Sequence, residues 1–203
     1  MGNTIINVGR SFGSGGGYVA QAIGRKLGIP VYDNERISRE AEQSGYSRGL
    51  FADGEQKRSL FSLSSFFSSG RLSYADSGYV NDNVMFDIQS EVIRNIALKG
   101  DAIIVGRCSD YILRDLECLD VFITAPMEYR IKRLVQNEGL TEDQAETLMH
   151  RKDRTRETYY NYYTFGSWGL ASNYDLCVDS SILGIEGTAD FIIDFGRKAG
   201  LIK

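Results

Sequence analysis

The hydrophobic pattern near the N-terminus changes its period abruptly. Residues 5–8 form a short β-prone run, and after a Gly/Ser stretch Val19, Ile23 and Leu27 recur at the spacing of one helical face. Gly28 is placed to end that helix in a left-handed cap. The pattern therefore predicts a strand, a glycine loop and a helix, in that order.

Two later stretches, residues 102–105 and 121–123, are unbroken apolar runs. Central strands of a parallel sheet have this pattern because both of their faces are covered. Strands that alternate with helices predict an α/β fold with a doubly wound parallel sheet, in a single domain of residues 1–203. The expected helices cover residues 34–44, an Asn81-Asp82 cap to Gly100, a segment opened by Pro126, a segment opened by a Thr141-x-x-Gln144 capping box, and about Ile185 to Ala199.

The segment between Gly45 and Gly78 has no clean period and is rich in Ser, Gly and Phe. Its aromatic residues need a partner surface, so the composition indicates an inserted lobe at residues 46–80 rather than a linker.

Composition narrows the class of partner. With 23 Lys and Arg against 27 Asp and Glu, the chain carries a formal net charge of −4, which argues against a nucleic acid polymer as partner. Its three cysteines lack CxxC spacing, so neither a zinc site nor a secreted disulfide framework is suggested. We find no targeting signal and no apolar run long enough to cross a bilayer. We expect a cytoplasmic protein without a membrane partner, and the oligomeric state stays open.

The glycine loop is the first candidate site, with the sequence Gly13-Ser14-Gly15-Gly16-Gly17. Backbone N–H groups of such a turn, together with the positive helix end, cradle phosphoryl oxygens without any side chain. The loop departs from the P-loop pattern G-x-x-x-x-G-K-[ST], because Gly16 and Gly17 stand at the lysine and hydroxyl positions. The alternative is that the glycines only allow a tight turn.

A dinucleotide site is a competing interpretation of the same loop. Gly13-x-Gly15 opens a G-x-G pattern, with Asp33 or Glu35 as the acidic residue further on. Tyr18 stands where the third glycine belongs, so the fit to a dinucleotide-dependent oxidoreductase is weak.

Two pairs of charged residues follow predicted strands. Asp33 and Arg39 lie just beyond a brief second strand predicted at Val31-Tyr32. There they either bind an exocyclic amine or sugar hydroxyl and a phosphate, or belong to a solvated helix start. Arg107 directly follows the run at 102–105, with Asp110 three residues on. A guanidinium buried there needs a bound anion, or else a structural carboxylate such as Asp110.

A dense cationic cluster lies on the helix after Thr141. Its members are Arg151, Lys152, Arg154 and Arg156, with Asp153 among them. Such a cluster in an acidic protein is typical of an arm that closes over phosphates and stabilises charge during phosphoryl transfer. The alternative is a solvated face in which nearby glutamates and aspartates pair with these cations.

Taken together, these segments resemble the cytidylate kinase-like family, a branch of the P-loop nucleoside monophosphate kinases, over nearly the whole chain. The resemblance is carried by residues 10–16, 27–33 and 105–113, the Asp153-x-x-Arg156 pair, and residues 174–180.

The resemblance implies a three-layer P-loop NTPase-like fold that transfers the γ-phosphoryl group of ATP to CMP or dCMP with Mg²⁺. Nucleotides would then be the small-molecule partners, with residues 13–17 on the donor phosphates. It also implies an acceptor-binding lobe at 46–80 and a helical lid arm at 140–170. The residues implied in acceptor binding are Asp33, Arg39, Arg107, Asp110 and Asp153, and those implied in catalysis are Arg107, Arg154 and Arg156.

The chain departs from cytidylate kinases proper in two places. They have Gly-Lys-Gly-Thr where this chain has residues 15–18, and an arginine where this chain has Met149. Arg10, Arg151, Lys152 and Arg154 are the candidates to replace the missing lysine. The alternative function is a nucleotide-binding protein that has lost catalysis together with that lysine.

Overall fold

The computed structural model describes residues 2–44, residue 46 and residues 77–203, with side chains described from residue 83 onward after the gap. Its centre is a five-stranded sheet in the order β2-β3-β1-β4-β5, and every neighbouring pair of strands is parallel. The strands are β1 (Ile5–Arg10), β2 (Val31–Tyr32), β3 (Ala102–Val105), β4 (Leu119–Thr124) and β5 (Leu176–Asp179).

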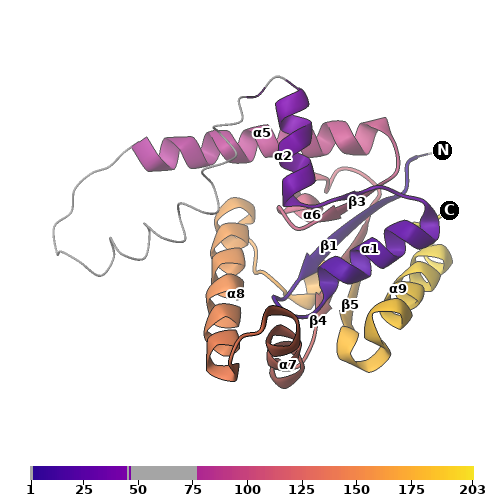
Figure 1. Ribbon diagram of the computed structural model, residues 1–203. Coiled ribbons are helices and arrows are strands. Elements are labelled where there is room, and N and C mark those ends of the chain that lie inside the picture. The colour runs from indigo at the N-terminus through magenta and orange to yellow at the C-terminus, as the bar shows by residue number, and fades with distance from the viewer. Residues whose placement is uncertain (1, 45, 47–76) are drawn as a thin grey trace.

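Helices cover both faces of this sheet (Figure 1). Helices α1 and α9 pack on one face, and α2, α5 and α6 pack on the other. The described helices are α1 (Gly16–Leu27), α2 (Asn34–Gln43), α5 (Ser77–Lys99), α6 (Ser109–Ile112), α7 (Met127–Glu138), α8 (Glu142–Thr164) and α9 (Ser180–Lys198), with a 3₁₀ turn at Ala171–Asn173.

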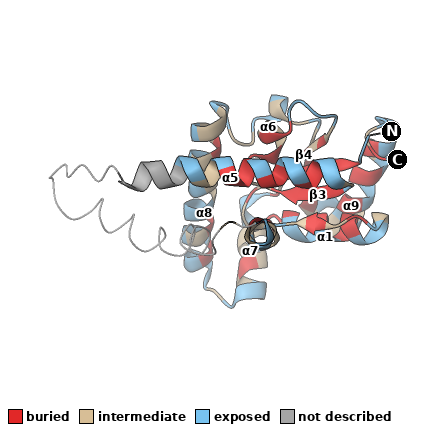
Figure 2. Ribbon diagram, turned by 90° about the horizontal axis from the view of Figure 1, so that it is seen from above, coloured by how far each residue is buried: buried red, intermediate tan, exposed pale blue. Residues whose placement is uncertain are grey.

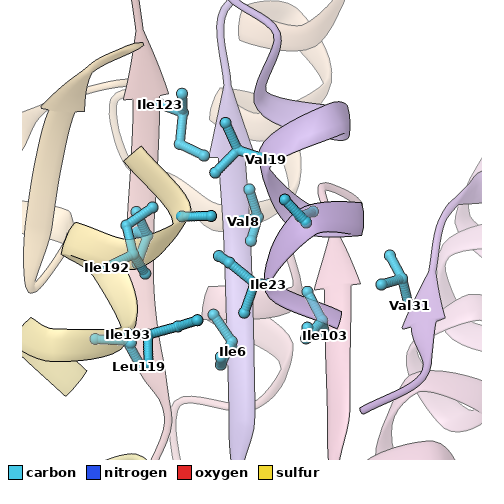
Figure 3. Packing of buried hydrophobic residues seen from close by; sticks show 14 of the residues in the cluster. Ile6, Val8, Val19, Ile23, Val31, Ile103, Leu119, Ile123, Ile192 and Ile193 are labelled. Atoms are coloured by element: carbon cyan, nitrogen blue, oxygen red, sulfur yellow. The ribbon is translucent and has the colours of Figure 1, made fainter. Parts of the chain in front are cut away.

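Alternation along β1 assigns its side chains to the two faces. Ile6 and Val8 point toward α1 and α9, where Val19 and Ile23 meet them (Figure 3). Ile5 belongs to the cluster on the opposite face. The central strand is thus covered on both faces.

Helix α5 lies across the second face. Val92, Ile93 and Ile96 are buried against the sheet, while Glu91 and Arg94 are exposed. Figure 2 shows buried and exposed stretches alternating along α5.

Helices α7 and α8 form a small core of their own beside the sheet. Leu134 of α7 packs with Ala145 and Met149 of α8, and the partly buried ring of Phe12 packs against them. This core attaches both helices to the glycine loop.

The predicted parallel α/β sheet is confirmed, as are the end of α1 at Gly28 and the capping box that opens α8 at Thr141. The predicted cap at Asn81-Asp82 is wrong, because α5 begins at Ser77. Most of the predicted lobe lies outside the described residues, since these exclude 47–76.

The last helix also begins earlier than predicted, at Ser180 instead of about Ile185. Asp179 caps the first turn by accepting a hydrogen bond from the Ser181 backbone, and Gly184 then kinks the helix. The kink explains why the hydrophobic period becomes regular only after it.

Thr188 gives a test of packing beneath α9. Its side chain is fully buried, and its hydroxyl has no hydrogen-bond partner among the described residues. Thr188→Val keeps the shape and removes the unsatisfied hydroxyl, so we expect it to raise the free energy of unfolding by about 1 kcal/mol. Urea unfolding measures this. Thr188→Ala, which leaves a cavity, is expected to lower stability, and a loss of stability in the valine variant would contradict the assignment.

Candidate functional site

The glycine loop joins the carboxyl end of β1 to α1 and is held against β4. The buried hydroxyl of Ser14 lies 2.8 Å from the carbonyl oxygen of Ser11 and 3.1 Å from that of Ile123. Gly15, with a φ of 84°, is the N-cap of α1 and has no side chain with which to cap the helix. A helix end of this kind is suited to an anion bound by backbone N–H groups.

Two arginines flank the loop. Arg10, the last residue of β1, packs against Gly16 and extends to Gly106 at the end of β3. On the other side, Cζ of Arg133 in α7 lies 3.2 Å from the position that a Cβ on Gly15 would take, and 4.8 Å from the centre of the Tyr18 ring. The loop therefore lies between cations from a strand and from a helix.

Asp153 of α8 fastens the start of the loop. Its carboxylate accepts a hydrogen bond from the Phe12 backbone N–H at 2.7 Å and forms an ion pair with Arg130 of α7. Arg130 in turn donates from Nε to the Phe12 carbonyl at 2.6 Å. With side chains only 12% and 19% exposed, Arg130 and Asp153 form a largely buried pair rather than a surface contact.

Arg156 lies one turn further along α8. Its Nη1 donates to the Arg10 carbonyl at 3.2 Å, and its guanidinium lies 5.3 Å from the centre of the Phe12 ring. It also stands 3.8 Å from the Asp153 carboxylate. The side chain that the sequence assigns to the lid is thus in contact with the backbone at the end of β1.

The segment after β3 has an uncommon backbone. Gly106, Arg107 and Cys108 have φ values of 76°, 63° and 54° in succession. A non-glycine residue in the left-handed region costs about 1–3 kcal/mol and persists at functional sites. The next turn of α8 lies beside this segment. Burial raises the pKa of the Tyr159 hydroxyl, and Arg107 opposes the rise through its charge and a side-chain hydrogen bond.

Asp110, in the first turn of α6, also meets α8. Its Oδ2 accepts a hydrogen bond from the Tyr160 hydroxyl at 2.7 Å, and burial raises the pKa of this carboxyl. The two residues line a hollow of about 260 Å³, together with Arg114, Asp120 and Thr164. Buried carboxyls with raised pKa values are common at functional sites.

A comparison with known protein families decides the affiliation. The family model described as "Cytidylate kinase-like family" matches residues 5–182. The chain belongs to the cytidylate kinase-like family.

Individual relatives agree with this assignment. The cytidylate kinase of Sulfolobus acidocaldarius is 28% identical over 107 residues, which cover 52% of this chain and 58% of that protein. The matched region thus spans little more than half the length of that relative. The cytidylate kinase of Pyrobaculum calidifontis is 22% identical over 196 residues, which cover 94% of this chain and 91% of that protein.

Solved structures confirm the predicted three-layer P-loop kinase fold. An uncharacterized protein from Eubacterium ventriosum has a TM-score of 0.69 and 27% identity, with 94% of this chain and 96% of that chain covered. Shikimate kinase from Acinetobacter baumannii, in complex with shikimate, has a TM-score of 0.54 at 13% identity, with 97% and 94% covered. The second likeness concerns the fold alone.

Within this kinase-like fold, the predicted site residues fall into two sets. One set is gathered along α8. Asp153 and Arg156 of this helix contact Phe12 and Arg10, directly before the glycine loop, and its tyrosines lie beside Arg107 and Asp110. The glycines of residues 13–17 belong to this set.

The second set lies apart from these contacts. Asp33 caps α2 by accepting from the Arg36 backbone N–H, and exposed Arg39 stands 3.8 Å from Glu35. Arg154 is exposed and lines a hollow of about 520 Å³ on α8 together with His150.

Four residues that the structure adds to the candidate site were not selected from the sequence: Arg130, Arg133, Tyr159 and Tyr160. Arg130 and Arg133 lie in the first two turns of α7, the helix that follows β4. Their position after a central strand is the feature that could have marked them as candidates, as it marked Arg107. The tyrosines had no such signal, because aromatic residues in a helix more often pack than bind.

Across the described ranges, no three His, Cys, Asp or Glu residues are grouped so as to hold a metal ion. The helices in these ranges also include none that combines the length and the apolar character of a membrane span.

The contacts of Asp153 with Arg130 and Phe12 predict a large effect of this residue on the stability of the fold. Asp153→Ala leaves Arg130 largely buried without its carboxylate and removes the acceptor of the Phe12 N–H, so we expect a loss of about 3 kcal/mol in the free energy of unfolding. Asp143→Ala, at an exposed position in the first turn of the same helix, is the matched control and should cost less than about 1 kcal/mol. Equal losses of stability in the two variants, measured by urea unfolding, would contradict this role of Asp153.

Asp120 predicts a pH dependence of stability. Burial raises the pKa of this carboxyl from 3.8 to about 6, with Asp110 and Asp175 adding to the rise and the Asn7 amide opposing it. Between about pH 4 and pH 6 the folded protein keeps a proton that the unfolded chain has released, so this group makes the free energy of unfolding fall as pH rises.

Asp120→Asn removes this titration and keeps an oxygen to accept from Asn7 Nδ2. We expect the variant to match the wild type near pH 4 and to be the more stable of the two near pH 7. Urea midpoints across this range test it, and an unchanged difference between the two proteins would show that Asp120 is not the group responsible.

Proposed function

We propose that this protein is an ATP-dependent phosphotransferase that phosphorylates CMP, dCMP or a related small acceptor. The observation that carries the proposal is that one helix, α8, contacts both the residues that lead into the glycine loop, Arg10 and Phe12, and Asp110 in the helical turn that follows β3. Phosphoryl transfer requires a donor and an acceptor held in line, and little covalent chemistry from the protein. A helix that touches both elements suits that task.

On the donor side, the N–H groups of residues 13–17 would bind the phosphates of ATP at the start of α1. Arg133, beside Gly15, would add positive charge to this end of the site. Asp153 holds the loop in place through Phe12, so its role in this proposal is to position the loop rather than to touch the substrate.

On the acceptor side, Arg107 would bind the phosphate of the monophosphate and Asp110 a polar group of its nucleoside. Asp33 and Arg39 follow β2, at the edge of the sheet and beyond β3. They would therefore contact the part of the acceptor farthest from the transferred group. Residues 46–80 would form the acceptor lobe and residues 140–170 the lid arm, with Arg154 on its exposed face.

Mg²⁺ is the metal expected with ATP. It usually takes one or two carboxylates and completes its shell with phosphate oxygens and water, so it does not need a group of three acidic residues. When bound, it neutralises charge on the donor phosphates. The protein would act in the cytoplasm.

Formation of ADP from MgATP, measured with a panel of nucleoside monophosphates, tests the proposal. We expect turnover with a cytidine monophosphate to exceed that with the others. Tight ATP binding without turnover of any acceptor would instead favour a non-catalytic nucleotide-binding protein. A larger rise in melting temperature with NAD(P) than with ATP would favour an oxidoreductase.

The two arginines of the site predict different kinetic defects. Arg107→Ala is expected to lower kcat/KM for the acceptor by about 100-fold, because it removes a contact to the acceptor phosphate. Arg156→Ala is expected to act mainly on kcat, because it disturbs the alignment of α8 on β1. Arg94→Ala, exposed on α5, is the matched control. Unchanged kinetics in both site variants would refute the assignment.

A further inference from the structure

The side chain of Arg10 passes between two glycines from different elements. A Cβ atom built on Gly16 would lie 2.6 Å from Cβ of Arg10 and 3.1 Å from its Cγ. A Cβ built on Gly106 would overlap Nη1 of Arg10 and lie 3.0 Å from its Cζ. The two glycines thus provide the space in which the stem and the head of this arginine lie.

This packing makes positions 10 and 16 mutually exclusive. The atom that comes closest to a side chain at Gly16 is Cβ of Arg10, whose position is fixed by its backbone in β1, and Cβ of Ile123 is 3.4 Å from the same point. A flexible head group can move aside, but a Cβ cannot. A lysine at position 16, where the P-loop pattern has it, cannot coexist with the present Arg10.

We propose that Arg10 is the phosphate-binding cation of the glycine loop, supplied from the end of β1 in place of the P-loop lysine. This inference rests on the proposed function and assigns the residue that contacts the donor phosphates. Arg10 ends β1, its stem packs on Gly16 in the first turn of α1, and its head lies at Gly106, directly after the neighbouring strand β3. In an open parallel sheet, ligands bind at this edge, where the order of the strands reverses.

The chemistry of the side chain fits the role. A guanidinium stays ionised at any working pH and can bind two phosphate oxygens at once, whereas a lysine acts as a point charge. Arg107 follows Gly106 directly, so Arg10 lies between the donor loop and the proposed acceptor arginine. This is where negative charge would gather during transfer between the two phosphates.

The test compares variants at both positions. Arg10→Met and Arg10→Lys differ in charge but have similar stems, and Arg10→Gly with Gly16→Lys restores the first glycine and the lysine of the P-loop pattern. Arg10→Gly and Gly16→Lys alone complete the cycle, and Arg197→Ala, exposed at the end of α9, is the control. For each protein we would measure urea stability, the rise in melting temperature with MgATP and with tripolyphosphate, and kcat and KM for MgATP.

We expect Arg10→Met to lose most of the MgATP-dependent rise in melting temperature and about 100-fold in kcat, and Arg10→Lys to keep more of both. Gly16→Lys should be destabilised in the presence of Arg10 and tolerated in the Arg10→Gly background. The double variant should bind MgATP more tightly than Arg10→Gly alone. A merely structural arginine would give the same ligand response in the methionine and lysine variants.

The failures are distinguishable. Wild-type response to MgATP in Arg10→Met, or full stability in Gly16→Lys, would overturn the assignment of Arg10 and leave the proposed function standing. A wild-type protein that responds to tripolyphosphate through Arg10 but to no nucleotide would refute the proposed function and support the phosphate contact. A wild type that responds to neither would overturn both.

Discussion

The carboxylate of Asp153 is the interaction on which the arrangement of the site depends. This carboxylate is largely buried, and the cost of removing its charge from water is offset by the ion pair with Arg130 and the hydrogen bond from the Phe12 backbone N–H. These partners come from α7 and from the start of the glycine loop. One carboxylate therefore fixes the loop, α7 and α8 relative to one another, and the small apolar core around Met149 completes their contact.

Fixing α8 at the loop also determines what its next turns can reach. From Asp153 the helix runs past Arg156 to Tyr159 and Tyr160, which lie against the segment after β3. That segment contains two consecutive non-glycine residues in the left-handed region, a conformation that a chain adopts only where surrounding contacts impose it. The hydrogen bond from Tyr160 to Asp110 is one such contact. The strained turn and the glycine loop are thus held by the same helix.

The sequence was sufficient for the elements whose signals are local. Apolar runs identified β3 and β4, Gly28 marked the end of α1, and the Thr141 capping box marked the start of α8. The start of α5 was missed because an Asn-Asp pair inside a helix looks like a cap when only neighbouring residues are considered. Local pattern also made Arg107 a candidate site residue, since a charge at the end of a buried strand is conspicuous, and its role stays a prediction.

The relations between the site residues were beyond such reasoning. Phe12 and Asp153 are 141 positions apart, and no spacing rule connects them. The packing of Arg10 against Gly16 and Gly106 could not be predicted either, because Gly106 follows another strand and is 96 positions from Arg10. From the sequence, Gly16 was only a missing lysine, and Arg10 was one of four cations able to replace it. Only the packing of the two glycines around Arg10 distinguishes it from the other three.

A phosphate-binding cation at position 10 is supported by different elements from a cation at position 16. A lysine at position 16 would belong to the first turn of a helix. Arg10 instead belongs to β1, where it pairs with β4, and the earlier residues of the same strand pair with β3. Its carbonyl also accepts the hydrogen bond from Arg156, so α8 is tied to the backbone that carries the cation. Rearrangement of α8 would therefore alter the support of Arg10 without moving α1. In this protein the phosphate-binding charge is coupled to the sheet and to α8, while the glycine loop contributes mainly backbone and space.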